Sequence, residues 1–216
     1  MAIYPPPDSI VFDLDGTLWD TNEACALAWN RVVARNGIHF REITAGDVRG
    51  VVGQPHEACI RSVFAGLSER ALGTLIQETM IEDNIAVAEQ GGKLFEGVAE
   101  GLVRLAGQFP LFIVSNCQAG YIELFLELHG FADLFQDFEC WGNTQQTKGE
   151  NLAALIRRNR LVAPLMVGDT DGDFEAAREN PATFVQVAWG FGPPIEGTLQ
   201  AGRFEQLVEM ILATKP

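Results

Sequence analysis

The sequence D-L-D-G-T at residues 13–17 constrains the fold more than any other part of the chain, because it directly follows an apolar run. That run, Ile10–Phe12, is typical of a strand buried in a parallel sheet. Side chains alternate along a strand, so Asp13 and Asp15 should lie on the same side of its end. Gly16 then permits a sharp turn with positive φ. Two carboxylates at a buried strand end need a cation, a shared proton or hydrogen bonds, although a simple Asp-Gly turn is the alternative.

Charge and composition limit the classes of partner. The 216 residues carry a formal net charge of −14, which argues against nucleic acid and anionic membranes as partners because both attract basic surfaces. No apolar run reaches the roughly 20 residues of a membrane span, and the N-terminus lacks the pattern of a signal peptide. The four cysteines have no metal-binding or C-x-x-C spacing. We therefore expect a cytoplasmic protein with reduced thiols, and the oligomeric state stays open.

The chain divides into a helical stretch and a stretch of alternating strands and helices. Residues 21–90 show helical periodicity without a strand-like run, and Thr44 and Ser68 can cap two of the helices. After residue 91, apolar runs of strand length alternate with amphipathic segments, which predicts an α/β fold with a doubly wound parallel sheet. We therefore expect a core domain of residues 1–20 and 91–216, with an inserted all-helical domain of residues 21–90.

The expected elements are listed here by their bounds. Helices are predicted over 23–36, 44–48, 56–65, 68–89, 97–106, 119–129, 148–159, 173–179 and 203–213, and strands over 10–12, 111–114, 134–140, 165–167 and 183–187.

Polar residues follow three of these apolar strands. Asp13 follows the first, Ser115-Asn116 follows Val114, and Asp169 follows Gly168. In open parallel sheets, ligands bind beyond the carboxyl ends of the strands, where the strand order reverses. We therefore expect these side chains to surround one site. Ser115 could hold a phosphate oxygen, or it could cap the helix 119–129.

Two further segments can contribute charge to such a site. Lys148 opens a predicted helix, where a cation is unfavourable; it is either a surface lysine or a cation directed at carboxylates and phosphate. The segment G-D-T-D-G-D at 168–173 resembles the start of a calcium loop, but Phe174 and Asn180 stand where that loop needs Gly and Glu. Mg²⁺, which prefers few carboxylates with waters and phosphate oxygens, is the better partner, and a solvated acidic loop is the alternative.

The four segments together resemble the haloacid dehalogenase superfamily. They occur in the order of its motifs: D-L-D-G-T at 13–17, S-N at 115–116, K at 148 and G-D-T-x-x-D at 168–173. The helical insertion between the first two motifs is similar to the cap of the phosphoglycolate phosphatase and β-phosphoglucomutase branch. The segments F-E-G-V at 95–98 and G-Q-P at 53–55 are also similar to that branch.

The resemblance implies a Mg²⁺-dependent phosphatase acting on a small phosphorylated metabolite. Asp13 would attack phosphorus to form an aspartyl phosphate, and Asp15 would act as acid and base. Asp13, the Asp15 carbonyl and Asp169 would be Mg²⁺ ligands, supported by Asp173, and Lys148 would offset the negative charge.

The resemblance also implies which residues bind substrate. Ser115 and Asn116 would hold the transferring oxygens, and Gly16 and Thr17 belong to the same phosphate-binding motif. Arg49 could face the substrate from the cap.

Other readings compete with a phosphatase. Dehalogenases of the superfamily need neither a second acidic Asp nor a metal, so Asp15 and the 168–173 cluster favour phosphoryl chemistry. A phosphosugar mutase needs a cap that grips a second phosphate; Gly53 stands where the mutase loop carries a cation, but Arg49 could serve. A non-catalytic binding or regulatory protein on the same fold is the third reading. Gln54 and His56 are further candidates to face the substrate, although the histidines otherwise read as core or surface residues.

Overall fold

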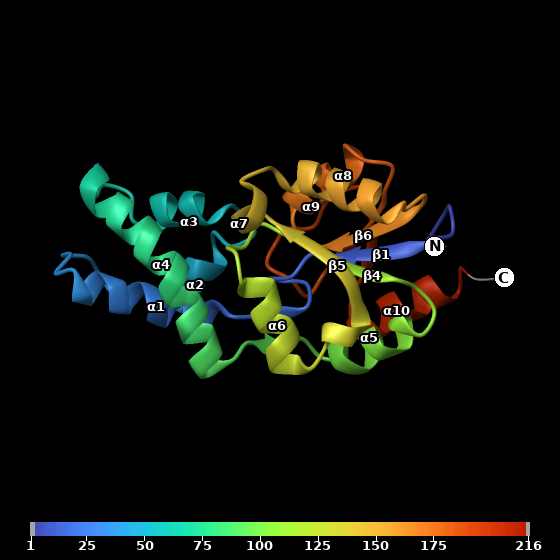
Figure 1. Cartoon of the computed structure of the whole chain (residues 1–216), viewed down its shortest axis with the longest axis horizontal. Coiled ribbons are helices and arrows are strands. Elements are labelled where there is room, and N and C mark those ends of the chain that lie inside the picture. The colour runs from blue at the N-terminus through green and yellow to red at the C-terminus, as the bar shows by residue number, and fades with distance from the viewer. Residues whose placement is uncertain (1–2, 215–216) are drawn as a thin grey trace.

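A six-stranded parallel sheet forms the centre of the computed structural model, which describes residues 3–214 (Figure 1). The strand order is β5-β4-β1-β6-β7-β8. The strands are β1 (Ser9–Phe12), β4 (Leu111–Ser115), β5 (Phe135–Cys140), β6 (Pro164–Gly168), β7 (Thr183–Val187) and β8 (Leu199–Ala201). The chain builds outward from β1 to β4 and β5, and then returns to β6 on the other side of β1. The strand order therefore reverses beside β1, where ligands bind in such sheets.

Helices cover both faces of this sheet. The elements α5 (Val98–Ala106), α6 (Tyr121–His129) and α10 (Phe204–Leu212) lie on one face, and α8 (Lys148–Asn159) and α9 (Asp171–Arg178) lie on the other (Figure 1). Side chains of β1 alternate between the two layers: Ile10 and Phe12 belong to the larger apolar core, while Val11 packs in the smaller core with α8 and α9. Burying each such side chain stabilises the fold by about 1.5–3 kcal/mol, so β1 is fixed from both sides.

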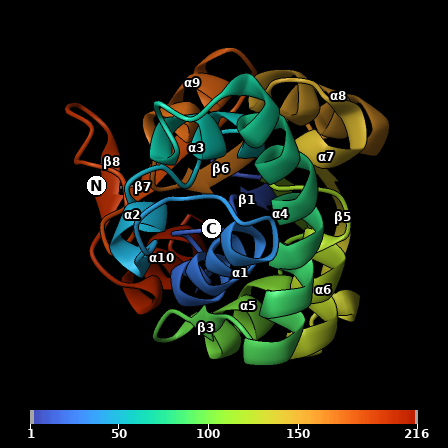
Figure 2. The ribbon, with the colours of Figure 1, turned by 90° about the vertical axis from the view of Figure 1, so that its left-hand side faces the viewer.

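The helical segment after β1 comprises four helices, α1 (Asn22–Arg35), α2 (Ala45–Arg49), α3 (His56–Val63) and α4 (Glu69–Gln90). Figure 2 shows them together at one end of the molecule, in front of the sheet. The chain leaves for these helices through β2 (Trp19–Asp20) and returns through β3 (Lys93–Leu94), and these two strands pair antiparallel. The helices therefore stand over the end of the sheet where β1 terminates.

The structure confirms the predicted fold class, an α/β fold with a parallel sheet and an all-helical insertion. The predicted elements need correction in two respects: four short elements were missed, and one helix begins earlier than predicted. The pair β2 and β3 flanks the helices, and neither these strands, β8 nor the short helix α7 (Trp141–Thr144) was predicted. Two- and three-residue strands are too short to show periodicity. Helix α9 begins at Asp171 rather than Asp173, because Thr170 caps it. In the described residues, no helix has the length and apolar character to cross a membrane.

Candidate active site

Three carboxylates from separate segments converge beyond the carboxyl ends of the strands. Asp13 follows β1, Asp169 follows β6, and Asp173 lies in the first turn of α9. One oxygen from each lies within 4.8 Å of the others, and all three side chains are buried. The expectation that the acidic residues at 13 and 169 meet is thus confirmed, and the spacing suits a single metal ion.

Lys148 brings a positive charge to these carboxylates. Its Nζ lies 2.6 Å from Oδ1 of Asp13 and 2.6 Å from Oδ1 of Asp173, and its side chain is only 4% exposed. The lysine is therefore buried rather than on the surface. It begins α8, where Thr147 caps the helix and the Glu150 carboxylate accepts a hydrogen bond from the backbone amide of Thr147. The cap anchors the helix end that a buried cation would otherwise disfavour.

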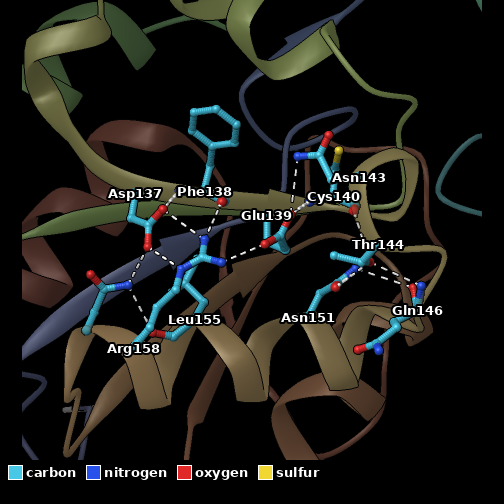
Figure 3. Close-up of polar contacts among 11 residues, drawn as sticks. Asp137, Phe138, Glu139, Cys140, Asn143, Thr144, Gln146, Asn151, Leu155 and Arg158 are labelled. Carbon is cyan, nitrogen blue, oxygen red and sulfur yellow. Dashed lines mark hydrogen bonds and ion pairs between the residues drawn. The ribbon is translucent and has the colours of Figure 1, made fainter.

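The other end of α8 is tied to the edge strand β5 (Figure 3). Arg158 forms ion pairs with Asp137 at 2.5 Å and with Glu139 at 2.6 Å. Nearer the lysine, Thr144 donates a hydrogen bond to Asn151 at 2.7 Å. These contacts join α8 to β5 and α7 at two levels, so the helix that carries Lys148 is fixed along its length.

The site holds more negative than positive charge. Burial, followed by the charge of Asp173, raises the pKa of Asp13 despite the opposing effect of Lys148. Burial also raises the pKa of Asp169, whereas for Lys148 the attraction of Asp13 and Asp173 outweighs burial and raises its pKa. In addition, Oδ2 of Asp13 is buried without a hydrogen-bond partner. An orphaned carboxylate oxygen among neighbouring carboxylates fits a divalent cation, which would supply the missing charge.

The backbone around Asp169 leaves no space for larger residues. Gly16 has φ of +84°, and a Cβ there would lie 2.6 Å from Oδ2 of Asp169. That oxygen accepts hydrogen bonds from the amides of Phe191 at 2.6 Å and Gly192 at 3.1 Å. Asp173 is held by the amide and hydroxyl of Thr170. Glycine at position 16 is therefore required by both conformation and contact.

Asp15 lies in a different environment from the three clustered carboxylates. Its Oδ1 accepts hydrogen bonds from Tyr121 Oη at 3.0 Å and Thr21 Oγ1 at 3.2 Å. Burial raises its pKa to about 6, against the hydrogen bond from Tyr121 and that from Thr21. A carboxyl with this pKa can both give and take a proton near neutral pH, which is what general acid–base chemistry requires.

Three further predicted site residues lie at the strand ends and each forms a hydrogen bond within the protein. Thr17 is buried and donates a hydrogen bond to Asp169 at 3.4 Å. Ser115 is buried and accepts a hydrogen bond from the amide of Cys117 at 3.2 Å; it does not cap α6, whose N-cap is Gly120. Asn116 reaches the helical segment by donating to the carbonyl of Gly53 at 2.8 Å.

A cavity connects the sheet end with the helical segment. Asp13, Asp15 and Ser115 line it from the sheet side, and Gln54 and His56 line it from the helical side. It encloses about 50 Å³, room for a few water molecules. A small molecule can therefore lie between the clustered carboxylates and the helices.

Arg49 is not among the residues that line this cavity. Its guanidinium lies 4.8 Å from the ring centroid of Phe191 and donates to the carbonyl of Gly190 at 3.4 Å. Arg49 thus joins the helical segment to the loop after β7 at the surface. These contacts support a structural role, whereas we expected Arg49 to face the substrate.

Sequence reasoning missed Tyr121 and Asp83 among the polar residues of the cavity. Tyr121 reads as one residue of the apolar face of its helix, but its hydroxyl bonds Asp15. Asp83 lies on the buried stripe of α4, between Leu75 and Val87, and lines the cavity. An acidic residue within an apolar stripe is a signal that could have identified Asp83, since such a residue is rarely buried without a partner.

Comparison with known proteins identifies the relatives of this chain. Residues 10–187 match the family model described as haloacid dehalogenase-like hydrolase. A phosphoglycolate phosphatase of Synechococcus elongatus is 30% identical over 186 residues, which cover 85% of this chain and 84% of that protein. A probable phosphatase, IndB, of Dickeya dadantii is 27% identical over 188 residues, covering 84% of this chain and 81% of that protein.

Solved structures show the same fold at low sequence identity. A haloacid dehalogenase-like family hydrolase from Streptococcus pneumoniae superposes with a TM-score of 0.81 at 22% identity, covering 94% of this chain and 98% of that one. The CbbY protein of Rhodobacter sphaeroides, crystallised with phosphate, gives a TM-score of 0.77 at 15% identity, covering 93% and 96%.

Proposed function

The chain belongs to the haloacid dehalogenase-like hydrolase family, and from this premise we propose that it is a Mg²⁺-dependent phosphatase acting on a small phosphorylated metabolite. The observation that carries the proposal is the unpartnered Oδ2 of Asp13, buried beside two carboxylates and one ammonium at the cavity. Relatives named as phosphoglycolate phosphatases support the reaction class.

In the first half-reaction, a carboxylate oxygen of Asp13 attacks phosphorus and forms an aspartyl phosphate. The bond between phosphorus and the leaving oxygen breaks, and Asp15 donates its proton to that oxygen, so the product leaves as a neutral alcohol. The pKa of Asp15, which burial raises to about 6, supports this role because the protonated form is accessible near neutral pH.

In the second half-reaction, Asp15 takes a proton from water, and the water oxygen attacks phosphorus. The bond from phosphorus to the Asp13 oxygen breaks, which releases inorganic phosphate and restores the free carboxylate. The Nζ atom of Lys148 lies 2.6 Å from Oδ1 of Asp13. Its ammonium group can therefore balance the negative charge that the phosphoryl oxygens bring.

The proposed metal ligands are Asp13, the backbone carbonyl of Asp15 and Asp169, with Asp173 supporting them. Bound Mg²⁺ would offset the charge of the phosphoryl group and help to hold one of its oxygens. Asp173 is already engaged by Lys148 and by Thr170, which supports a role in positioning rather than in direct coordination.

Phosphate binding is assigned to the loops at the strand ends. We propose that Ser115, Asn116 and the turn at Gly16 and Thr17 contact the phosphoryl oxygens. We also propose that residues 21–90 act as a cap domain on a core of residues 1–20 and 91–216, closing over the reacting groups and excluding water. The protein is proposed to work in the cytoplasm, where its four buried thiols stay reduced.

The alternatives have less support. A mutase must hold a second phosphate in the cap, but none of the residues that line the cavity in the described chain is Lys or Arg. A non-catalytic protein would have no need for a buried lysine between two carboxylates. Removing these charges from water costs free energy that their mutual attraction does not always repay.

The test is hydrolysis of acetyl phosphate by the wild type, with Mg²⁺ and with excess EDTA. We expect turnover that EDTA abolishes, and Asp13→Asn should lower kcat by about three orders of magnitude or more. An independent readout is ¹⁹F NMR of BeF₃⁻, which should form a Mg²⁺-dependent adduct with the wild type only. Equal hydrolysis by the wild type and Asp13→Asn would refute the nucleophile.

A further inference from the structure

The cavity extends from the reacting groups to a polar cluster between α1, α3 and α4. Asp13 and Asp15 line the cavity, and so do Asp83, His56 and Trp29 from the helices. Asp83 is 2% exposed, and its Oδ1 is buried without a hydrogen-bond partner. An unpartnered buried carboxyl oxygen is costly unless a ligand completes it.

The other oxygen of Asp83 is well engaged. Oδ2 accepts a hydrogen bond from Trp29 Nε1 at 3.3 Å and lies 3.5 Å from Nδ1 of His56. These two contacts fix the orientation of the carboxyl group, and Oδ1 is the oxygen left without a hydrogen-bond partner. The Cys25 thiol also interacts with the carboxyl group, while Oδ1 has no hydrogen-bond partner among the described residues.

The protonation of this pair follows from its hydrogen bonds. The Thr79 hydroxyl donates to the carbonyl of Leu75 at 2.6 Å, so it must accept from Nε2 of His56 at 2.8 Å. Burial favours neutral His56 and therefore an unprotonated Nδ1, which faces Asp83 Oδ2. A proton between these two atoms removes the repulsion of their lone pairs. Oδ1 is consequently an acceptor, and the pair as a whole is uncharged.

Among the described residues, the rest of the lining has no positively charged side chain that would attract a negatively charged leaving group. None of the lining residues in the described chain is Lys or Arg, and the ammonium of Lys148 is held by Asp13 and Asp173. Trp29, Cys25 and Cys59 supply mostly apolar surface around Asp83. A carboxylate on the leaving group would lose its hydration here without a cation to replace it.

We propose that Oδ1 of Asp83 accepts a hydrogen bond from a hydroxyl group on the leaving alcohol. Resting on the phosphatase activity proposed above, this assigns the substrate class: phosphate monoesters of small neutral alcohols that carry a further hydroxyl group, in preference to esters with an anionic leaving group such as glycolate. The cavity of about 50 Å³ limits that alcohol to a few heavy atoms in the closed arrangement.

The test compares three esters whose leaving groups each have two carbons: 2-hydroxyethyl phosphate, ethyl phosphate and 2-phosphoglycolate. For the wild type we expect kcat/KM for the hydroxyethyl ester to exceed that for the ethyl ester by about tenfold or more, because an acceptor built for a hydroxyl is left unpaired without it. It should exceed that for phosphoglycolate by about a hundredfold.

Substitutions at position 83 test whether Asp83 causes the preference for the hydroxyethyl ester over the ethyl ester. Asp83→Leu should bring the hydroxyethyl-to-ethyl ratio close to one, whereas Asp83→Asn, which keeps an acceptor oxygen, should retain most of it. Glu78→Gln is the matched control on the same helix, since Glu78 pairs with Arg35 at the surface; it should leave the ratio unchanged. Thermal melts establish that each variant folds.

The outcomes separate this proposal from the proposed function. Turnover of phosphoglycolate equal to or above that of the hydroxyethyl ester overturns the substrate class but leaves a phosphatase. A folded Asp83→Leu with an unchanged ratio overturns the role of Asp83. Failure of the wild type to hydrolyse any of the esters or acetyl phosphate with Mg²⁺ overturns both proposals. Should Asp83→Leu not fold, the wild-type order of the three esters decides.

Discussion

At the scale of single residues, His56 and Asp83 form a buried pair whose pKa values move in opposite directions. Burial lowers the pKa of His56 from 6.5 to about 4, against a smaller opposing effect of a hydrogen bond to the backbone of Ile76. Burial raises the pKa of Asp83 well above 3.8, and the hydrogen bond from Trp29 opposes this only partly. Both pKa shifts favour the neutral forms, so the pair carries no net charge at a pH between the pKa of His56 and the raised pKa of Asp83.

This pair predicts a pH dependence of stability that can be isolated with His56→Gln. Below pH 6.5 the unfolded chain protonates His56, whereas the folded protein does so only near pH 4. The stability that neutral His56 contributes is therefore present above pH 6.5 and lost as the pH falls to about 4. Urea unfolding should show the wild type losing about 3 kcal/mol relative to His56→Gln across that window.

For Asp83→Asn, the difference in free energy of unfolding from the wild type should change with pH in the opposite direction. The folded protein keeps the proton of Asp83 above pH 3.8, where the unfolded chain has lost it. The contribution of Asp83 is present below pH 3.8 and lost as the pH rises through its raised pKa, at about 1.4 kcal/mol per pH unit. If the two residues formed an imidazolium–carboxylate ion pair instead, both differences would reverse, and the protonation inferred here would be wrong.

The sequence was sufficient to predict the charged residues that cluster at the end of the sheet, but not those on the helical side of the cavity. Asp13, Lys148, Asp169 and Asp173 were predicted because each stands directly at the end of a strand or the start of a helix, where topology fixes its position. Asp83 lies mid-helix, and its approach to His56 depends on how α3 packs against α4, which no local pattern specifies.

At the scale of elements, the position of Lys148 depends on how α8 is attached to β5. Arg158 bonds Asp137, Glu139 and the carbonyl of Phe138 (Figure 3). The side chain of Arg158 is 40% exposed, so solvent screens part of this network. We expect Arg158→Met to lower the free energy of unfolding by about 1 kcal/mol, measured by urea denaturation, because three contacts are lost together.

Arg157→Met is the matched control for this prediction. Arg157 is its neighbour on α8 and has no ion pair among the described residues, so its replacement should change stability by less than about 0.5 kcal/mol. A double-mutant cycle of Arg158→Met with Asp137→Asn should give a coupling energy above about 0.5 kcal/mol. Additive effects would mean that the network does not anchor the helix.

Element boundaries were predictable where a capping residue marks them. Thr44 and Ser68 cap α2 and α4, as expected from their side chains, and Thr147 caps α8 in the same way. The pair of β2 and β3 was not predictable, since Trp19 and Leu94 are brought together only by the return of the chain from the helical segment. Local propensity does not encode a contact of that kind.

At the scale of the whole molecule, the end of α2 and the loop at Gly53 meet the loops at the end of the sheet. Asn116 donates to the carbonyl of Gly53 at 2.8 Å, and Arg49 lies over the ring of Phe191. The chain at Gly53 has φ of +96°, and a Cβ there would lie 3.0 Å from Cγ2 of Thr170. The helices thus approach the sheet end closely at a point where only glycine fits without displacement.

This close approach predicts that Gly53→Ala impairs the reaction more than the fold. A methyl group at this position pushes the loop away from Thr170 and Asn116, so the cavity opens and the reacting groups are held less well. With acetyl phosphate as substrate, kcat/KM should fall about tenfold or more, because misplacement on the scale of an ångström is expensive in catalysis. The left-handed conformation itself costs alanine about 1–2 kcal/mol of stability.

Gly66→Ala separates these two effects. Gly66 has a nearly equal φ of +93°, but a Cβ there meets nothing within 4 Å. The two variants should therefore lose similar free energies of unfolding in urea, while only Gly53→Ala loses activity. An equal loss of activity in both would show that backbone strain, transmitted through the helical segment, limits turnover. Unchanged activity in both would show that the contact between Gly53 and Thr170 does not control how the helices close over the sheet.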